Sequence, residues 1–185
     1  IYTAKQIKKW DEFTIQTEPI SSHALMERAA ARATKYILAN HTFESVAIIC
    51  GPGNNGGDGL VIAKLLFESL RKVNLYIISA TAYSSDFKCQ LKQLPEELQP
   101  KTIDRLQAKQ LATSDLLIDC IFGTGLSREV RGKFADIIQA INHCESPTIA
   151  IDIPSGLFAE TNNSNDGAII EAVQTLSFMQ FKRSF

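Results

Sequence analysis

Residues 51–59 form the most unusual chemistry-bearing segment of the sequence and read Gly-Pro-Gly-Asn-Asn-Gly-Gly-Asp-Gly. The glycines at 51, 53 and 56 match the GxGxxG spacing that lets a backbone approach a pyrophosphate at the start of a helix. Five glycines would be costly in a plain connecting turn, since each removes about 0.5–1 kcal/mol of stability. The segment therefore predicts a phosphate-binding turn, although the paired asparagines and Asp58 do not belong to the redox form of this motif.

The residues that follow argue against an ordinary dehydrogenase. A redox domain with this turn presents an acidic residue about 20 residues further on, where it binds the ribose hydroxyls. No Asp or Glu occurs from Arg71 to Ser85, and no hydride-transfer partner is evident. An NAD(P)-dependent oxidoreductase is therefore disfavoured.

Two further segments place a carboxylate at the end of an apolar run. Asp119 is followed by a glycine turn and a polar loop with Arg128, and Asp152 opens the sequence Asp-Ile-Pro-Ser-Gly, in which Ser155 precedes a turn. Either aspartate could simply accept hydrogen bonds from nearby backbone N–H groups. The two aspartates are more informative when they are considered together with the turn that contains Asn54 and Asn55, here called the asparagine turn. The three features indicate a shared polar site.

Hydrophobic periodicity predicts the elements that must position these side chains. Two helices come first, the second capped by the hydroxyls of Ser21 and Ser22 and closing at residues 40–41. Short apolar runs then alternate with helical segments, as in strands buried on both faces of a sheet. The first helix is expected at residues 3–16, the strands at 45–50, 73–79, 116–120, 148–153 and 173–178, and the later helices at 60–67, 83–94 and 132–142.

This alternation predicts a Rossmann-like three-layer αβα sandwich with a mainly parallel central sheet and two N-terminal helices. Ligands of such sheets bind beyond the carboxyl ends of the strands. The polar turns at residues 51–59, 123–132 and 152–156 all follow expected strands. We therefore expect their side chains to converge at one edge of the sheet.

Bulk composition limits the function classes. The 185 residues suffice for one domain, and 19 basic against 20 acidic side chains leave a net charge of −1. Nucleic acid and membrane surfaces are not expected as partners, since both require clustered positive charge. No apolar run could span a bilayer, and no signal-peptide pattern is present. The four cysteines lack metal or redox spacing, which favours buried thiols and a cytoplasmic location.

The segments GPGNNGGDGLVIAKLL, DCIFGTGLSREVRG and IAIDIPSGL, with SSHALMERAA upstream, closely resemble the NAD(P)H-hydrate epimerase family, also called the YjeF N-terminal domain. The resemblance runs from about Thr3 to Phe178, and the GTGLSREVRG form is nearer to bacterial members. The chain starts at Ile1 and ends abruptly. We therefore expect a single domain over residues 1–185 that is truncated at its C-terminus, the epimerase part of a longer or bifunctional protein.

The resemblance implies interconversion of the R and S forms of NADHX and NADPHX, which are NADH and NADPH hydrated at the nicotinamide ring. It also implies a homodimer and an ATP- or ADP-dependent dehydratase, fused or separate, in nicotinamide nucleotide repair. It further implies a potassium ion bound by Asn55, Asp119 and Ser155. The implied dinucleotide contacts are Asn54, Asn55, Gly56, Gly57, Asp58, Gly123, Thr124, Gly125, Leu126, Ser127, Arg128, Glu129 and Asp152.

The chemistry of this reaction suits the residues. Inversion at a hydroxyl-bearing carbon next to a ring nitrogen can proceed by loss of water or by ring opening, and either route needs a proton donor and a base. We assign that role, as a hypothesis, to Asp152, because it ends a strand beside the expected nicotinamide pocket. The alternative function is a non-catalytic nucleotide-binding module or a dimerisation scaffold, as in mRNA-decapping proteins. A scaffold has no need of the asparagine turn and two strand-end aspartates.

Overall fold

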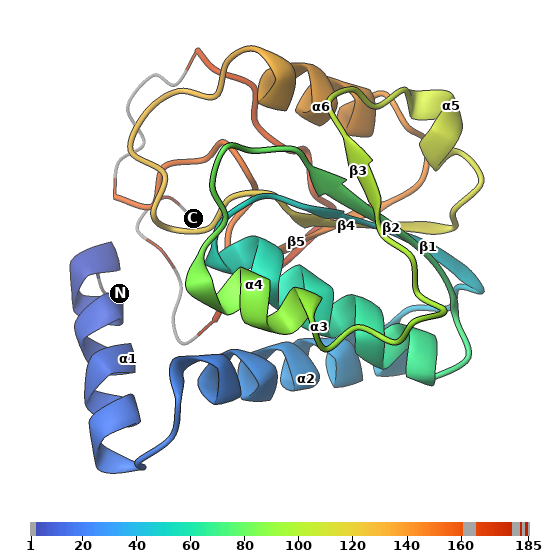
Figure 1. Cartoon of the computed structure of the whole chain (residues 1–185). Helices are drawn as coiled ribbons and strands as arrows, with labels where there is room; N and C mark the ends of the chain where they lie inside the picture. The colour runs from blue at the N-terminus through green and yellow to red at the C-terminus, as the bar shows by residue number, and fades with distance from the viewer. Residues whose placement is uncertain (1–2, 161–165, 179–181, 183, 185) are drawn as a thin grey trace.

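The structure, a computed structural model, describes residues 3–160, 166–178, 182 and 184. Its elements alternate along most of the chain (Figure 1). The helices are α1 (Ala4–Thr17), α2 (Ser22–Asn40), α3 (Asn54–Glu68), α4 (Ser85–Leu91), α5 (Ala108–Leu111) and α6 (Lys133–Asn142). The strands are β1 (Ser45–Cys50), β2 (Lys72–Ile78), β3 (Lys101–Ile103), β4 (Leu116–Cys120), β5 (Thr148–Ile151) and β6 (Gln174–Leu176).

The strands form one sheet in the order β3-β2-β1-β4-β5-β6, and every pair is parallel. The chain moves outward from β1 to β3, then returns to β4 on the other side of β1 and moves outward again. A crevice opens at such a reversal point, beyond the carboxyl ends of the two central strands. The predicted αβα fold class is confirmed.

Side chains of the central strands alternate between two cores. Val46 and Ile48 of β1 belong to the core under α2, α3 and α4, whereas Ala47 and Ile49 belong to the core under α6. This two-sided burial explains why an apolar run without alternation forms a strand. Figure 1 shows α3 and α4 on one face, α5 and α6 on the other, and α1 standing to one side of the sandwich.

The sequence missed two short elements and misplaced the start of one helix. β3 lies just after Pro95 and Pro100 and has three residues, none of them fully buried, so no apolar run marks it in the sequence. The short helix α5 was missed because it too lacks an apolar pattern. The predicted turn at residues 51–59 is also too long, because α3 already begins at Asn54. Tertiary packing holds its glycines in the helix against their low helix propensity.

Helix α2 offers a test of local capping. Ser21 has extended backbone angles, and its hydroxyl accepts a hydrogen bond from the N–H of Ala24 at 3.3 Å, as predicted. Ser21→Ala should lower the free energy of unfolding by about 1 kcal/mol, which corresponds to about 2–4 °C in Tm. Thermal melting checks this against Ser127→Ala in an exposed loop. Equal melting temperatures would show that packing alone holds the start of α2.

Candidate active site

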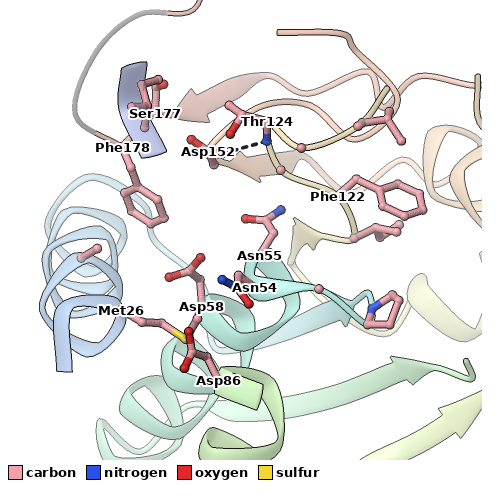
Figure 2. Close-up of a pocket in the computed structure, with 18 of the residues that line it drawn as sticks. Met26, Asn54, Asn55, Asp58, Asp86, Phe122, Thr124, Asp152, Ser177 and Phe178 are labelled. Carbon is pink, nitrogen blue, oxygen red and sulfur yellow. Dashed lines mark hydrogen bonds between the residues drawn. The ribbon is translucent and has the colours of Figure 1, made fainter. Parts of the chain in front are cut away.

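A cavity of about 2000 Å³ opens at the reversal point (Figure 2). It is larger than the 300–1000 Å³ or so that small ligands usually occupy, and so could hold a dinucleotide. Its walls come from α1, α2, the start of α3, the loop after β4, the end of β5, and β6. The three polar segments singled out in the sequence therefore all contribute residues to one cavity.

The start of α3 forms one wall of the cavity. The N–H of Gly51 donates to the carbonyl of Cys120 at 3.0 Å, which fixes the helix start against β4. The first N–H groups of a helix lack partners within the helix and favour anions. Asn54 is exposed, whereas Asn55 is only 7% exposed and neither atom of its side-chain amide has a hydrogen-bond partner. Such a buried, unsatisfied amide is usually paired with an ordered water, an ion or a polar ligand rather than left without a partner.

Asp119, near the carboxyl end of β4, and Ser155, in the turn after β5, lie within hydrogen-bonding distance of each other. Both are completely buried. Asp119 accepts hydrogen bonds from the hydroxyl of Ser155 at 2.6 Å, from the N–H of Ser155 at 2.8 Å and from the N–H of Ile121 at 3.0 Å. Burial raises the pKa of the Asp119 carboxyl to about 6, although these hydrogen bonds oppose the rise. Asp119 thus has the local capping role that the sequence left open. No hydrogen bond links Asn55 to either residue.

Asp152 directly follows β5. Its backbone φ is 68°, a value that residues other than glycine rarely adopt. Its Oδ2 accepts from the N–H of Thr124 at 3.1 Å, and its Oδ1 lies 2.8 Å from the ammonium Nζ of Lys182. Lys182 is only 1% exposed and also donates to the carbonyl of Phe178 at 3.0 Å. Two donors therefore fix the Asp152 carboxylate at the cavity wall.

The remaining predicted contact residues divide between the cavity and the interior. The loop after β4 lines the cavity, with Gly125, Ser127 and Arg128 exposed and Leu126 packed toward the α6 core. The carboxylate of Glu129 is 2.5 Å from Arg131. Gly56 and Gly57, in contrast, are buried inside α3 and are not among the residues that line the cavity.

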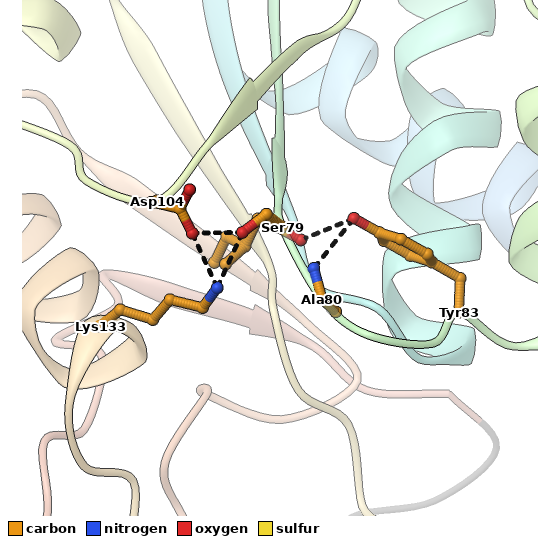
Figure 3. A network of polar contacts seen from close by, with 6 residues as sticks. Ser79, Ala80, Tyr83, Asp104 and Lys133 are labelled. Carbon is orange, nitrogen blue, oxygen red and sulfur yellow. Dashed lines mark hydrogen bonds and ion pairs between the residues drawn. The ribbon is translucent and has the colours of Figure 1, made fainter.

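A polar network occupies the carboxyl end of β2 (Figure 3). The ammonium of Lys133 donates to the Ser79 hydroxyl and to Oδ1 of Asp104, each at 2.8 Å, and Ser79 also donates to Asp104. Hydrogen bonds from Lys133 and Ser79 lower the pKa of the Asp104 carboxyl. The carboxylate at the carboxyl end of β2 is thus that of Asp104, from the loop after β3, and it accepts hydrogen bonds from two protein side chains. In a dehydrogenase, the carboxylate expected there accepts hydrogen bonds from the ribose hydroxyls of the dinucleotide instead.

Sequence reasoning missed Lys182 and Asp104. Lys182 lies 30 positions after Asp152, and no spacing rule connects the two. Asp104 follows the strand that the sequence did not predict. Only a correct assignment of β3 as a strand could have drawn attention to Asp104, as an aspartate that directly follows a strand.

Fold and cavity together define a Rossmann-like αβα domain with a dinucleotide-sized site at the reversal of its sheet. The family described as YjeF-related protein N-terminus matches residues 22–184. The chain belongs to this family.

Named relatives cover nearly the whole chain. A protein called NAD(P)H-hydrate epimerase from Anaerococcus prevotii is 38% identical over 99% of this chain and 86% of its own length. One of the same name from Limosilactobacillus fermentum is 35% identical over 95% and 84%, respectively. A bifunctional NAD(P)H-hydrate repair enzyme from Coxiella burnetii is 30% identical over 99% of this chain but 37% of its own length.

A solved structure supports the fold. The crystal structure of the yeast protein ynu0 superposes with a TM-score of 0.82 at 20% identity and covers 100% of this chain and 82% of the yeast chain. In addition, no helix within the described part of the chain is both long and apolar enough to cross a membrane.

Proposed function

We propose that this chain is an isomerase that interconverts the R and S forms of NADHX and NADPHX at the hydroxylated nicotinamide carbon, in nicotinamide nucleotide repair. One observation carries the proposal: the Asp152 carboxylate is held by Lys182 and by the N–H of Thr124 at the wall of a dinucleotide-sized cavity. The relatives named NAD(P)H-hydrate epimerase support the same reaction.

Asp152 is the acid/base group in this proposal. A carboxylate held on both oxygens can accept a proton from the substrate hydroxyl, or return one, without first reorienting. The amide side chains of Asn54 and Asn55 and the N–H groups at the start of α3 suit the polar groups of the dinucleotide. The loop after β4 lines the cavity beside Asp152, since the N–H of Thr124 donates to that carboxylate.

A potassium ion fits the oxygen atoms present. Asn55, Asp119 and Ser155 would hold it, since a hard cation is satisfied by amide, carboxylate and hydroxyl oxygens. The unpartnered amide of Asn55 and the absence of a cationic partner for Asp119 among the described residues are the observations that agree with such an ion. When bound, the ion would offset ligand phosphate charge.

Exchanging potassium for choline at constant ionic strength should lower Tm. A cation present at about ten times its Kd stabilises the folded state by about 1.4 kcal/mol, which corresponds to about 3–6 °C. Asn55→Ala should abolish the difference, whereas Asn54→Ala, a change at the exposed neighbour, should retain it. Identical melting of the wild-type chain in both salts would remove the ion from the proposal.

The activity is tested directly with a mixture of NADHX epimers and a purified S-specific dehydratase. With this chain present, all of the NADHX should become NADH, whereas without it only the S form should be consumed. If the R form persists at high concentrations of this chain, the epimerase function is rejected. Dinucleotide binding without conversion would then favour the alternative of a nucleotide-binding module, and the lack of both would favour a scaffold.

A homodimer and a dehydratase partner are further parts of the proposal. Helix α1 exposes Trp10 by 44% and Phe13 by 63%, which provides apolar surface for a second copy. Sedimentation equilibrium at micromolar concentration tests this, and a monomer mass would reject the dimer.

The bifunctional name of the Coxiella burnetii relative supports a dehydratase as fused or separate partner. The four free thiols agree with a cytoplasmic location, which cell fractionation would test.

A further inference from the structure

A second carboxylate faces the cavity opposite Asp152. Asp58 lies on α3, whereas Asp152 follows β5, and both line the cavity. In Figure 2 the side chains of Asp58 and Asp152 enter the same space from different sides, and Asn55 lies beside that space. A planar ring bound between them would therefore have one carboxylate on each side.

The surroundings of Asp58 differ from those of Asp152. No hydrogen bond or ion pair from the described residues reaches the Asp58 carboxylate, whereas Asp152 is paired with Lys182. Burial raises the pKa of Asp58 well above its usual range, and repulsion from Asp152, Asp11 and Asp86 raises it further. Burial and neighbouring charges thus favour the protonated form of Asp58, whereas Asp152 pairs with the ammonium of Lys182. Two carboxyl groups in such different surroundings can take separate acid and base roles.

Asn55 indicates independently that a ligand fills the space between them. Its side-chain amide is more than nine-tenths buried, opens on the same cavity and has neither a donor nor an acceptor partner. A polar ligand that satisfies this amide would lie within the space that Asp58 and Asp152 face. Asp86 also lines the cavity, but it differs from Asp58 because the Ser22 hydroxyl donates to its carboxylate at 2.6 Å.

We propose that Asp58 is a second catalytic acid/base residue, which acts on the face of the hydroxyl-bearing carbon opposite to Asp152. This inference rests on the proposed epimerase function and deepens it. Of the two routes to inversion, the proposal takes the loss of water. On this route a hydroxyl leaves from one face and water enters from the other, and a single carboxylate serves only one face.

The proposed step balances as follows. Asp58 gives its proton to the substrate hydroxyl, the C–O bond breaks, and its electron pair leaves with the oxygen as water. The lone pair of the ring nitrogen forms the C=N bond of an iminium. A second water then bonds to the carbon from the other face, the C=N π electrons return to nitrogen, and Asp152 takes the proton that this water loses. Inversion in the opposite direction reverses these roles, and solvent exchange resets the two carboxyls.

Oxygen exchange in ¹⁸O-labelled water tests this scheme on each separated epimer. Asp58→Asn and Asp152→Asn should each reduce inversion in both directions by at least about 100-fold. Each variant should still exchange the oxygen of one epimer with retention, because one carboxyl can both expel and return water on its own face. The epimer that exchanges should differ between the two variants.

Other outcomes overturn the inference without rejecting the epimerase. Wild-type inversion by Asp58→Asn, or a raised KM with unchanged kcat, would show that Asp58 does not act on the reacting carbon. If the wild-type chain fails to interconvert the epimers at all, the proposed function itself is wrong, and this inference fails with it.

A carboxylate outside the cavity provides the control. Asp136 is exposed on α6 and does not line the cavity, so Asp136→Asn should keep the inversion rate within about twofold. Asp58→Asn keeps the size of the side chain and replaces a carboxyl whose charged form its neighbours repel, so its melting temperature should not fall. Asp58→Ser, with a smaller neutral side chain, serves as a second variant and should show the same one-sided oxygen exchange.

Discussion

Asp152→Asn should reduce epimerisation by about 10²–10⁴-fold, the range in which general acid–base groups contribute to catalysis. The Kd of the dinucleotide should change by less than about threefold, since the amide keeps the size of the carboxylate and an oxygen that accepts hydrogen bonds. Stopped assays of the R-to-S rate and calorimetric binding of NADP⁺ separate the two effects. A fall in kcat at unchanged Kd is the expected signature of a group needed in the transition state.

Asparagine is the appropriate replacement because Lys182 is buried against Asp152. The amide oxygen of Asn can still accept a hydrogen bond from the ammonium, and Asn tolerates the left-handed backbone at this position better than most residues. Asp152→Ala would leave the ammonium buried without a partner, which destabilises proteins by about 3–5 kcal/mol. A loss of activity in the alanine variant could therefore reflect unfolding.

Asp136→Asn is the matched control for Asp152→Asn, because Asp136 is exposed in the first turn of α6. Its epimerisation rate and melting temperature should equal those of the wild-type chain. Turnover of the Asp152 variant at the wild-type rate would reject the acid/base role, and the Thr124 and Lys182 contacts would then be structural.

The central part of the fold was predictable because it repeats one physical pattern. β1 and β4 are buried on both faces, so their apolar runs mark them in the sequence. The edge strand β3 has little burial and no such run. The start of α3 was misplaced because intrinsic propensity disfavours glycine in helices, whereas contacts with β1 and β4 require it there.

The candidate site was predictable to the extent that topology determines it. The carboxyl ends of parallel strands lie at one edge of a sheet, which places Asp152 and Asn55 at one cavity. Lys182 pairs with Asp152 across 30 positions of the sequence, and no local pattern predicts such a contact. The observed hydrogen bonds of Asp119 and its proposed role as a cation ligand involve the same carboxylate oxygens, so its sequence position alone could not separate the two.

Gly56→Ala should destabilise the chain and weaken dinucleotide binding together. A Cβ atom at this position would lie 1.8 Å from the carbonyl oxygen of Gly51, which is backbone and cannot rotate away. The start of α3 would have to move away from β1, and Asn55 would move with it. We expect the free energy of unfolding to fall by about 3 kcal/mol and Tm by about 6–12 °C, although alanine normally favours a helix.

Gly53→Ala separates this steric effect from the general effect of removing a glycine. Gly53 caps the same helix with a φ of −88°, and no atom lies within 4 Å of a Cβ built there. This change should lower the free energy of unfolding by at most about 1 kcal/mol, the usual difference between glycine and alanine at a helix N-cap. Chemical denaturation of both variants measures the contrast. Equal stabilities would mean that the start of α3 is pliable, and that close packing against Gly51 does not position the asparagine turn over the cavity.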